Sequence, residues 1–278
     1  MLELLHAERI KLLRHRASWF LVWIFPIGIS AVIAGVTIYE MIKGLPPEPG
    51  PPDTAASWIE DTTFPWQISA NTVGRYLLAA FTAIAFGGEY GWNTWKLVGP
   101  HRGRGALFGA KYLTVLALIA TSLALAALLA TAGLWINGAL TSDPVPAGVE
   151  LTALLAAQAR AALVTGLTVL LTVAYASAGA VLTRSTIAGL VIAIVAITVE
   201  SLVGQLGSRF LNPTVFQMLP SYHLNNLASW VLGGKALAQK FPQTVVSLHW
   251  GWSLASYALW TGGLIALTVG AFRRQDLN

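Results

Sequence analysis

The sequence predicts an all-α integral membrane protein with six transmembrane helices, an N-terminal interfacial helix, and short re-entrant helices before the last span. Composition is the first reason, because 55% of the 278 residues are hydrophobic and only 10% are charged, far from the usage of soluble domains. The apolar residues also form long runs, and about 20 residues suffice to cross a bilayer as a helix. Lys and Arg collect beyond alternate runs, as the positive-inside rule requires. We therefore expect a single transmembrane domain over residues 1–278.

The chain opens with a charged helix, residues 1–17, that we expect at the cytoplasmic surface of the membrane. Leu residues gather on one side of it, but Arg9 and Arg16 intrude into the same sector. Leu side chains can enter the lipid while Arg side chains snorkel toward the headgroups. A basic anchor that only fixes the topology is the alternative.

Six apolar runs are the predicted spans, and Trp or Tyr residues near several of their ends are typical of aromatic belts. These runs are residues 18–42, 71–88, 112–137, 161–182, 186–207 and 248–272. The Pro-rich residues 44–53 should form an extended external linker. The fourth helix should begin earlier, at Leu151, which places Gln158 and Arg160 at the outer interface. A tight turn at residues 183–185 then leads into the fifth span.

Charge counts support this topology. With both termini in the cytoplasm, eleven of the 17 Lys and Arg residues lie on the cytoplasmic side, which is the bias that orients membrane proteins. The eleven are Arg9, Lys11, Arg14, Arg16, Lys96, Arg102, Arg104, Lys111, Arg184, Arg273 and Arg274.

Two polar features interrupt the apolar pattern. Glu200 lies within the fifth span, where a lone carboxylate costs about 2.5–3.5 kcal/mol on insertion scales unless it is protonated, paired or hydrated. We expect it to face a cavity or a neighbouring helix, with free solvation at headgroup level as the alternative. Residues 208–247 contain a helical pattern from Tyr222 to Leu232 between Pro and Gly breaks. Such broken helices at membrane depth must be buried in protein or line water, so we predict short external re-entrant helices, with a surface loop as the alternative.

Several kinds of chemistry have no motif in the chain. There is no cysteine, no Gly-rich phosphate loop and no His-Glu-x-x-His pair. The basic residues do not form a stripe interleaved with aromatics, so no nucleic-acid partner is expected. We expect neither an enzyme nor a bound cofactor or metal.

The polar segment of residues 89–111 is the most informative stretch. It carries one carboxylate and four cations between two apolar runs, and Gly99-Pro100 should end a short helix over residues 92–98. An ordinary charged loop that only sets orientation is the bland interpretation. The order Glu89-Tyr90, Thr94, Pro100, Arg104, Lys111, however, resembles the loop between the second and third spans of ABC-transporter permeases of the type-2 exporter class (the ABC-2 family). Asn93 stands where that family usually has Gly, and the gap between Pro100 and Arg104 is one residue longer than the family's pattern.

The resemblance implies a membrane subunit that pairs with a second permease and with separate ATPase subunits in a bacterial cytoplasmic membrane. ATP and Mg²⁺ would then bind the ATPase. Contact with the ATPase would fall on Glu89, Tyr90, Thr94, Lys96, Pro100, Arg104 and Lys111. The first, second and fifth spans would line the path of an amphipathic or lipid-like substrate, a peptide or a drug, with Glu200 as its main polar group. The rival hypothesis is an ATP-independent scaffold or immunity protein. An ion-coupled carrier would need paired intramembrane acids or repeated broken spans, and the sequence shows neither.

Overall fold

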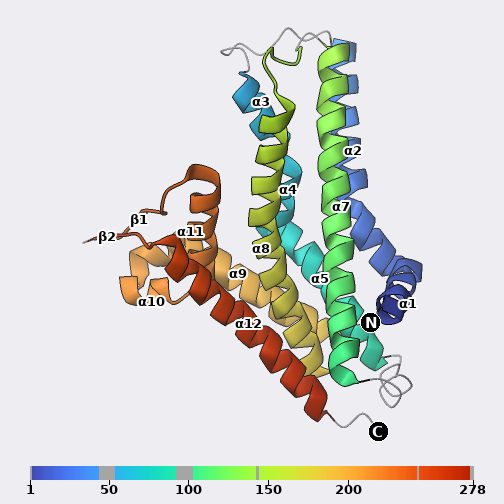
Figure 1. The fold of residues 1–278 in the computed structure, drawn as a ribbon, viewed down its shortest axis with the longest axis vertical. Coiled ribbons are helices and arrows are strands. Elements are labelled where there is room, and N and C mark those ends of the chain that lie inside the picture. The colour runs from blue at the N-terminus through green and yellow to red at the C-terminus, as the bar shows by residue number, and fades with distance from the viewer. Residues whose placement is uncertain (1, 44–53, 92–102, 142–143, 243, 276–278) are drawn as a thin grey trace.

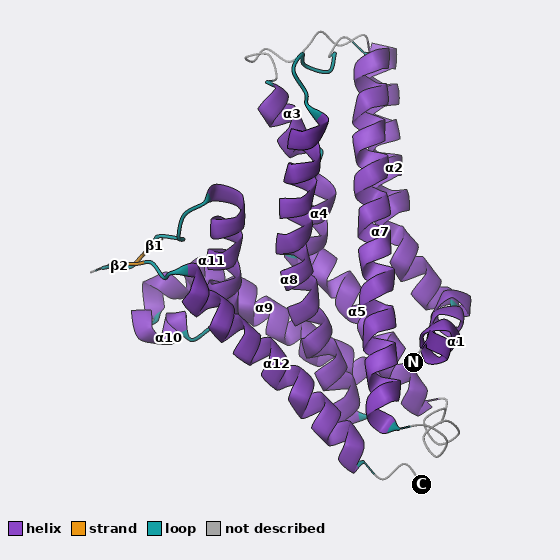
Figure 2. Cartoon of the chain, viewed as in Figure 1, coloured by secondary structure: helices purple, strands orange, loops and turns teal. Residues whose placement is uncertain are grey.

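The computed structural model describes residues 2–43, 54–91, 103–141, 144–242 and 244–275. Nearly all of this chain is helical, with one short hairpin (Figure 2). The elements are α1 (Leu2–Arg14), α2 (Arg16–Lys43), α3 (Ala55–Asp61), α4 (Phe64–Ala70), α5 (Thr72–Gly91), α7 (Arg104–Leu140), α8 (Leu151–Thr183), α9 (Thr186–Phe210), α10 (Pro213–Gln217), α11 (Pro220–Gly233), β1 (Gln239–Lys240), β2 (Val245–Val246) and α12 (Trp250–Arg274).

Five helices in the described chain are long and apolar enough to cross a membrane: α2, α7, α8, α9 and α12. The all-helical class predicted from the sequence is confirmed. The remaining predicted span, residues 71–88, corresponds to the 20-residue helix α5, which is not one of the five. Arg75, Glu89 and several glycines make α5 less apolar than its neighbours.

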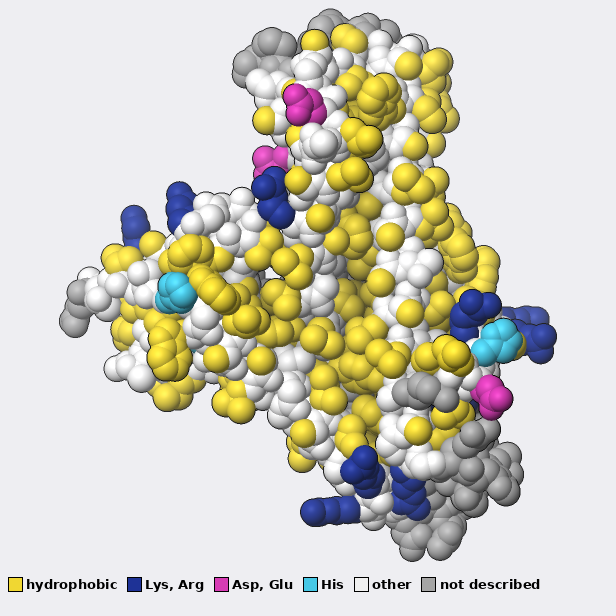
Figure 3. Space-filling view, viewed as in Figure 1, with side chains coloured by type: hydrophobic (Ala, Val, Ile, Leu, Met, Phe, Trp, Pro, Cys, Tyr) yellow, Lys and Arg dark blue, Asp and Glu magenta, His cyan; other side chains and the backbone are white. Residues whose placement is uncertain are grey.

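The long helices form a bundle around α8 (Figure 1). On one side α2 packs along α7, and on the other α5, α9 and α12 pack against α8. The helix α1 and the end of α12 lie at the same end of the bundle, where Lys and Arg side chains gather (Figure 3). We call this the basic end, and the opposite end, where α3 and the start of α8 lie, the far end.

The turn between α8 and α9 matches the tight turn predicted at residues 183–185. Arg184 adopts the left-handed conformation with φ 55°, which ends α8 and reverses the chain. Ser185 then caps α9 by accepting a hydrogen bond from the Ala188 backbone at 3.3 Å. The two helices can pack closely because a Cβ at Gly189 would lie only 2.6 Å from the Ala180 backbone.

The segment before the last span is partly as predicted. The helix α11 covers the expected Tyr222–Leu232, and Gly234 ends it with φ 65°. Residues 239–246 differ from the prediction of broken helices, because Gln239 pairs with Val246, and Lys240 with Val245, in a two-stranded hairpin. Pro242 lies in the hairpin turn, where it cannot continue a helix. The short helices α3 and α4 were not predicted.

A buried polar contact fastens α11 to α12. His223 Nδ1 lies 3.3 Å from the Ser253 hydroxyl, and Asn226 donates to the same hydroxyl at 2.7 Å. Asn226 also accepts from the Leu237 backbone at 2.7 Å. The helix α11 is thus joined to the last helix by hydrogen bonds and not by apolar contact alone.

Candidate functional site

Four charged side chains meet at the basic end, and we call them the Glu89 cluster: Glu8, Lys11, Glu89 and Lys111. Glu89 lies in the last turn of α5 and accepts from Lys111 of α7 at 2.5 Å and from Lys11 of α1. Lys111 also donates to Glu8 of α1 at 2.6 Å. One cluster therefore joins three helices that are far apart in sequence.

The cluster is buried and electrically balanced. Lys111 has no exposed surface and Glu89 has 2%. Removing an ion from water costs several kcal/mol, which mutual attraction offsets only when the partners are close and hydrogen-bonded. Two carboxylates and two ammonium groups meet that condition here, and the loss of either Glu89 or Lys111 leaves the buried centre of the cluster short of one charge.

Two neighbouring residues fasten the chain that follows α12. The Tyr90 hydroxyl donates to Gln275 Oε1 at 2.7 Å. Arg104, at the start of α7, donates to the carbonyl oxygens of Arg273 and Gln275 at 2.8 and 2.6 Å. Gln275 in turn donates to the Val181 carbonyl at 2.7 Å. These bonds connect the ends of α5, α7, α8 and α12.

The structure thus brings together four of the residues predicted from the 89–111 segment: Glu89, Tyr90, Arg104 and Lys111. The predicted residues Thr94, Lys96 and Pro100, and the short helix predicted over 92–98, lie outside the described residues. Since Glu89 and Lys111 pair directly, the two ends of the segment are held together at the basic end of the bundle. Sequence reasoning missed Glu8 and Lys11, because nothing in the pattern of α1 distinguishes the charges that turn toward α5 and α7.

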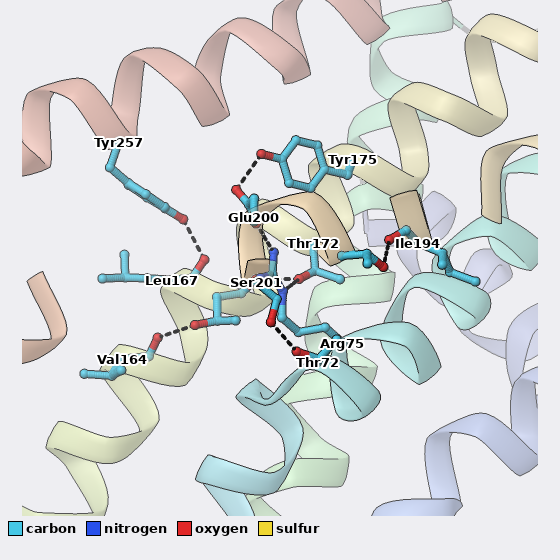
Figure 4. A network of polar contacts seen from close by, with 12 residues as sticks. Thr72, Arg75, Val164, Leu167, Thr172, Tyr175, Ile194, Glu200, Ser201 and Tyr257 are labelled. Atoms are coloured by element: carbon cyan, nitrogen blue, oxygen red, sulfur yellow. Dashed lines mark hydrogen bonds and ion pairs between the residues drawn. The ribbon is translucent and has the colours of Figure 1, made fainter. Parts of the chain in front are cut away.

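A second network lies deeper in the bundle (Figure 4). The Arg75 guanidinium of α5 donates to Glu200 of α9 at 2.7 Å and to Thr172 of α8 at 3.0 Å. The other carboxylate oxygen of Glu200 accepts from the Tyr175 hydroxyl at 2.8 Å. Both charged residues are buried, at 7% and 8% exposure. Three helices are therefore joined by one hydrogen-bonded ion pair.

Glu200 thus faces neighbouring helices, as expected, and is not freely solvated. Its partner, Arg75, was not identified from the sequence. Oppositely charged residues at similar depth in two spans are the signal that could have found the pair, because a buried charge needs a partner at its own level. Two further hydrogen bonds between α5 and α9 flank the pair, Thr72 to Ser201 at 3.1 Å and Tyr76 to Thr198 at 2.5 Å.

Both networks have α5 in common. Glu89 anchors the end of α5 to α1 and α7, and Arg75, fourteen residues earlier, anchors α5 to α8 and α9. Neither network leaves a charged group free to act on a substrate.

Comparison with known protein families identifies the family of the chain. The family described as "ABC-2 family transporter protein" matches residues 4–200, a range that contains both networks. A search among curated proteins finds no match to the chain. Since the family covers well over half of the chain, and five of the described helices can cross a membrane, this protein is a multi-pass membrane protein that belongs to the ABC-2 transporter family.

Proposed function

We propose that this chain is the permease subunit of an ATP-driven ABC exporter. Family membership supports the class of protein. The geometric observation that carries the proposal is the contact between Glu89 and Lys111 at 2.5 Å, because it closes the base of the segment between α5 and α7. A loop that is clamped at its base can receive a push from a partner and pass it to the helices on either side.

In this proposal the nucleotide and Mg²⁺ bind separate ATPase subunits, and the chain pairs with a second permease. The basic end faces the cytoplasm of a bacterial cell, as the positive-inside rule favours. Residues 89–111 then meet the ATPase. Because Glu89 and Lys111 are buried, they stabilise this segment and do not touch the ATPase. Thr94, Lys96 and Pro100 then make the contact with the ATPase.

We also propose that α5 is the sixth crossing. The start of α2 and the end of α12 lie at the same end of the bundle, and a chain that returns to its starting side crosses an even number of times. Five crossings would separate the termini. A helix of 20 residues is about 30 Å long, which is the thickness of the hydrocarbon core.

The moving part of the exporter would be α5. The end of α5 carries Glu89, which pairs with Lys111. Its buried Arg75 couples α5 to α8 and α9 at a depth where charges are rare. Cargo would be an amphipathic or lipid-like molecule, a peptide or a drug, and it would pass between the two permeases. α2, α5 and α9 would line this path.

Affinity purification of the tagged protein from mild detergent, with mass spectrometry of the eluate, tests the proposal. We expect an ATPase in roughly equal amount. Lys96→Glu should reduce its recovery several-fold without changing the amount of permease in the membrane. Arg274→Glu, which makes the same charge change at the exposed end of α12, should not.

Recovery of the permease alone from several detergents, even after crosslinking, would contradict the proposal and favour an ATP-independent scaffold or immunity protein. Equal loss of ATPase in both variants would mean that general charge at the basic end, and not the 89–111 segment, recruits the partner.

A further inference from the structure

A cavity of about 800 Å³ opens at the far end of the bundle, away from both networks described above. It lies between α3 and α4 on one side and α8 on the other, with Leu232 of α11 at its edge. Its inner wall is apolar and includes Ala157, Ala161 and Val164 of α8. Its volume is within the range of small-molecule binding sites.

The wall of this cavity is fixed by hydrogen bonds. Trp66 of α4 donates to Gln158 of α8 at 2.7 Å, and Gln158 donates to the Thr62 hydroxyl at 2.9 Å. Deeper in the cavity, Thr165 of α8 donates to the Trp66 carbonyl at 3.0 Å. A ligand would therefore enter a preformed site and would not have to order it.

Two opposite charges line the cavity as well. Glu60 of α3 and Arg160 of α8 are both exposed lining residues. Within the described part of the chain, neither side chain forms a hydrogen bond or an ion pair, in contrast to the charges of the two buried networks. An apolar wall with one free carboxylate and one free guanidinium complements a molecule that has an apolar body and a zwitterionic head.

The depth of the cavity indicates what kind of molecule this is. Arg160 precedes the end of α8 at Thr183 by 23 residues, a distance of about 34 Å at the helical rise of about 1.5 Å per residue. The hydrocarbon core is about 30 Å thick. With Thr183 at one membrane surface, Arg160 lies at the level of the headgroups of the opposite leaflet, and Ala161 and Val164 lie at the level where acyl chains begin.

We propose that this cavity binds a zwitterionic phospholipid with a primary amine in its headgroup. Arg160 pairs with the phosphate, for which a guanidinium is well suited, and Glu60 accepts hydrogen bonds from the ammonium group. One acyl chain then lies along the alanine-rich face of α8. The site does not depend on the proposed function, since it requires neither an ATPase nor transport.

The test uses the purified permease alone, in nanodiscs of equal parts phosphatidylethanolamine and phosphatidylglycerol with identical acyl chains. Native mass spectrometry after release from the nanodiscs measures which lipid stays bound. We expect phosphatidylethanolamine to be retained in preference. Arg160→Gln should lower the retained lipid about tenfold, the change that follows from the loss of one charged hydrogen bond.

Three further variants separate the contributions. Glu60→Gln should abolish the preference for phosphatidylethanolamine while the phosphate contact persists. Ala157→Phe should fill the cavity and lower retention with both charges intact. Arg209→Gln is the matched control, because Arg209 is exposed on α9 and does not line the cavity; it should behave as the wild type.

Equal retention of the two lipids by the wild type and by Arg160→Gln would overturn the proposal and leave only non-specific boundary lipid. A lipid-free dimer would also overturn the proposal, if a cysteine introduced at Ala153 in the cavity wall crosslinks to the same cysteine of a second chain. The cavity would then be an interface between two chains.

Discussion

Lys111 carries a full charge and has no exposed surface. Its buried ammonium group is stabilised by the carboxylates of Glu89 and Glu8. Removing one member of a buried ion pair costs about 3–5 kcal/mol. We expect Glu89→Ala to lower the free energy of unfolding by an amount near the lower end of that range, because Glu8 still contacts Lys111. Thermal unfolding of the protein in detergent measures this. The exposed Glu60→Gln is the control and should change little.

The double variant Glu89→Ala/Lys111→Met should recover most of the lost stability, because it removes both the charge and its unmatched partner. If Glu89→Ala instead unfolds like the wild type and yet abolishes transport, Glu89 acts by direct contact with a partner and not through the cluster.

We expect His223 of α11 to make the stability of the protein sensitive to acid. Burial lowers the pKa of His223 below its ordinary value of 6.5, and a hydrogen bond with the Gln217 backbone opposes this shift without cancelling it. As the pH falls, His223 therefore binds a proton at a higher pH in the unfolded chain than in the folded protein. The contribution of His223 to stability is therefore fully present above pH 6.5 and is lost as the pH falls from there toward the folded-state pKa.

Unfolding temperatures measured between pH 7.5 and pH 5 would show this slope. In His223→Gln the slope should be smaller, because glutamine has no proton to gain, although the variant is expected to be less stable throughout. An unchanged slope would mean that another group controls the acid sensitivity.

The closest approach between α5 and α9 depends on a glycine. A Cβ at Gly87 would lie 2.6 Å from the Thr186 Cα, and backbone atoms cannot move aside as a flexible side chain can. We expect Gly87→Ala to separate the two helices and to cost about 1–3 kcal/mol, as overpacking does. Gly91→Ala is the matched control in the same helix, since among the described residues a Cβ there meets nothing within 4 Å.

Gly87→Ala should also lower transport more than it lowers the amount of protein in the membrane, if α5 moves against α9. Measuring the unfolding temperature and the expression level of both variants checks the packing argument. Wild-type stability in Gly87→Ala would show that the helices can separate at no cost.

Hydropathy located the long helices well, because an apolar run of the right length has few other uses. The fifth span, predicted at residues 186–207, is α9 at Thr186–Phe210. Hydropathy could not locate α3 and α4. These helices have seven residues each and are too short for a helical period to be distinctive. It could not pair Arg75 with Glu200 either, because 125 residues separate them and only the packing of three helices brings them together.

The topology of the whole molecule can be tested by chemical labelling, because the chain has no cysteine. If the basic end is cytoplasmic and α8, α9 and α12 each cross the membrane, Ala147→Cys at the far end should react with an impermeant maleimide in intact cells. Arg274→Cys at the basic end should react only after lysis. Labelling of both in intact cells would place the two ends on the same side of the membrane, which is incompatible with three crossings between them.

For the whole molecule, the sequence predicted the protein class and family better than the contacts between functional residues. Composition and charge bias were sufficient for a multi-pass membrane protein, and the motif at Glu89-Tyr90 for its family. The Glu89 cluster could not be predicted, since two of its four charged residues come from α1. Charge patterns show which residues are unusual for a membrane, but only the fold shows which of them are partners.

The Glu89 cluster also has a consequence for how the protein is made. Lys11 precedes Glu89 by 78 residues, and Glu8 precedes Lys111 by 103, so a ribosome completes α1 long before either partner exists. During synthesis α1 must wait at the membrane surface with its charges in water. It can dock only after α5 and α7 have been inserted, which makes its docking a late step of biogenesis and a natural marker that the first half of the bundle has been assembled.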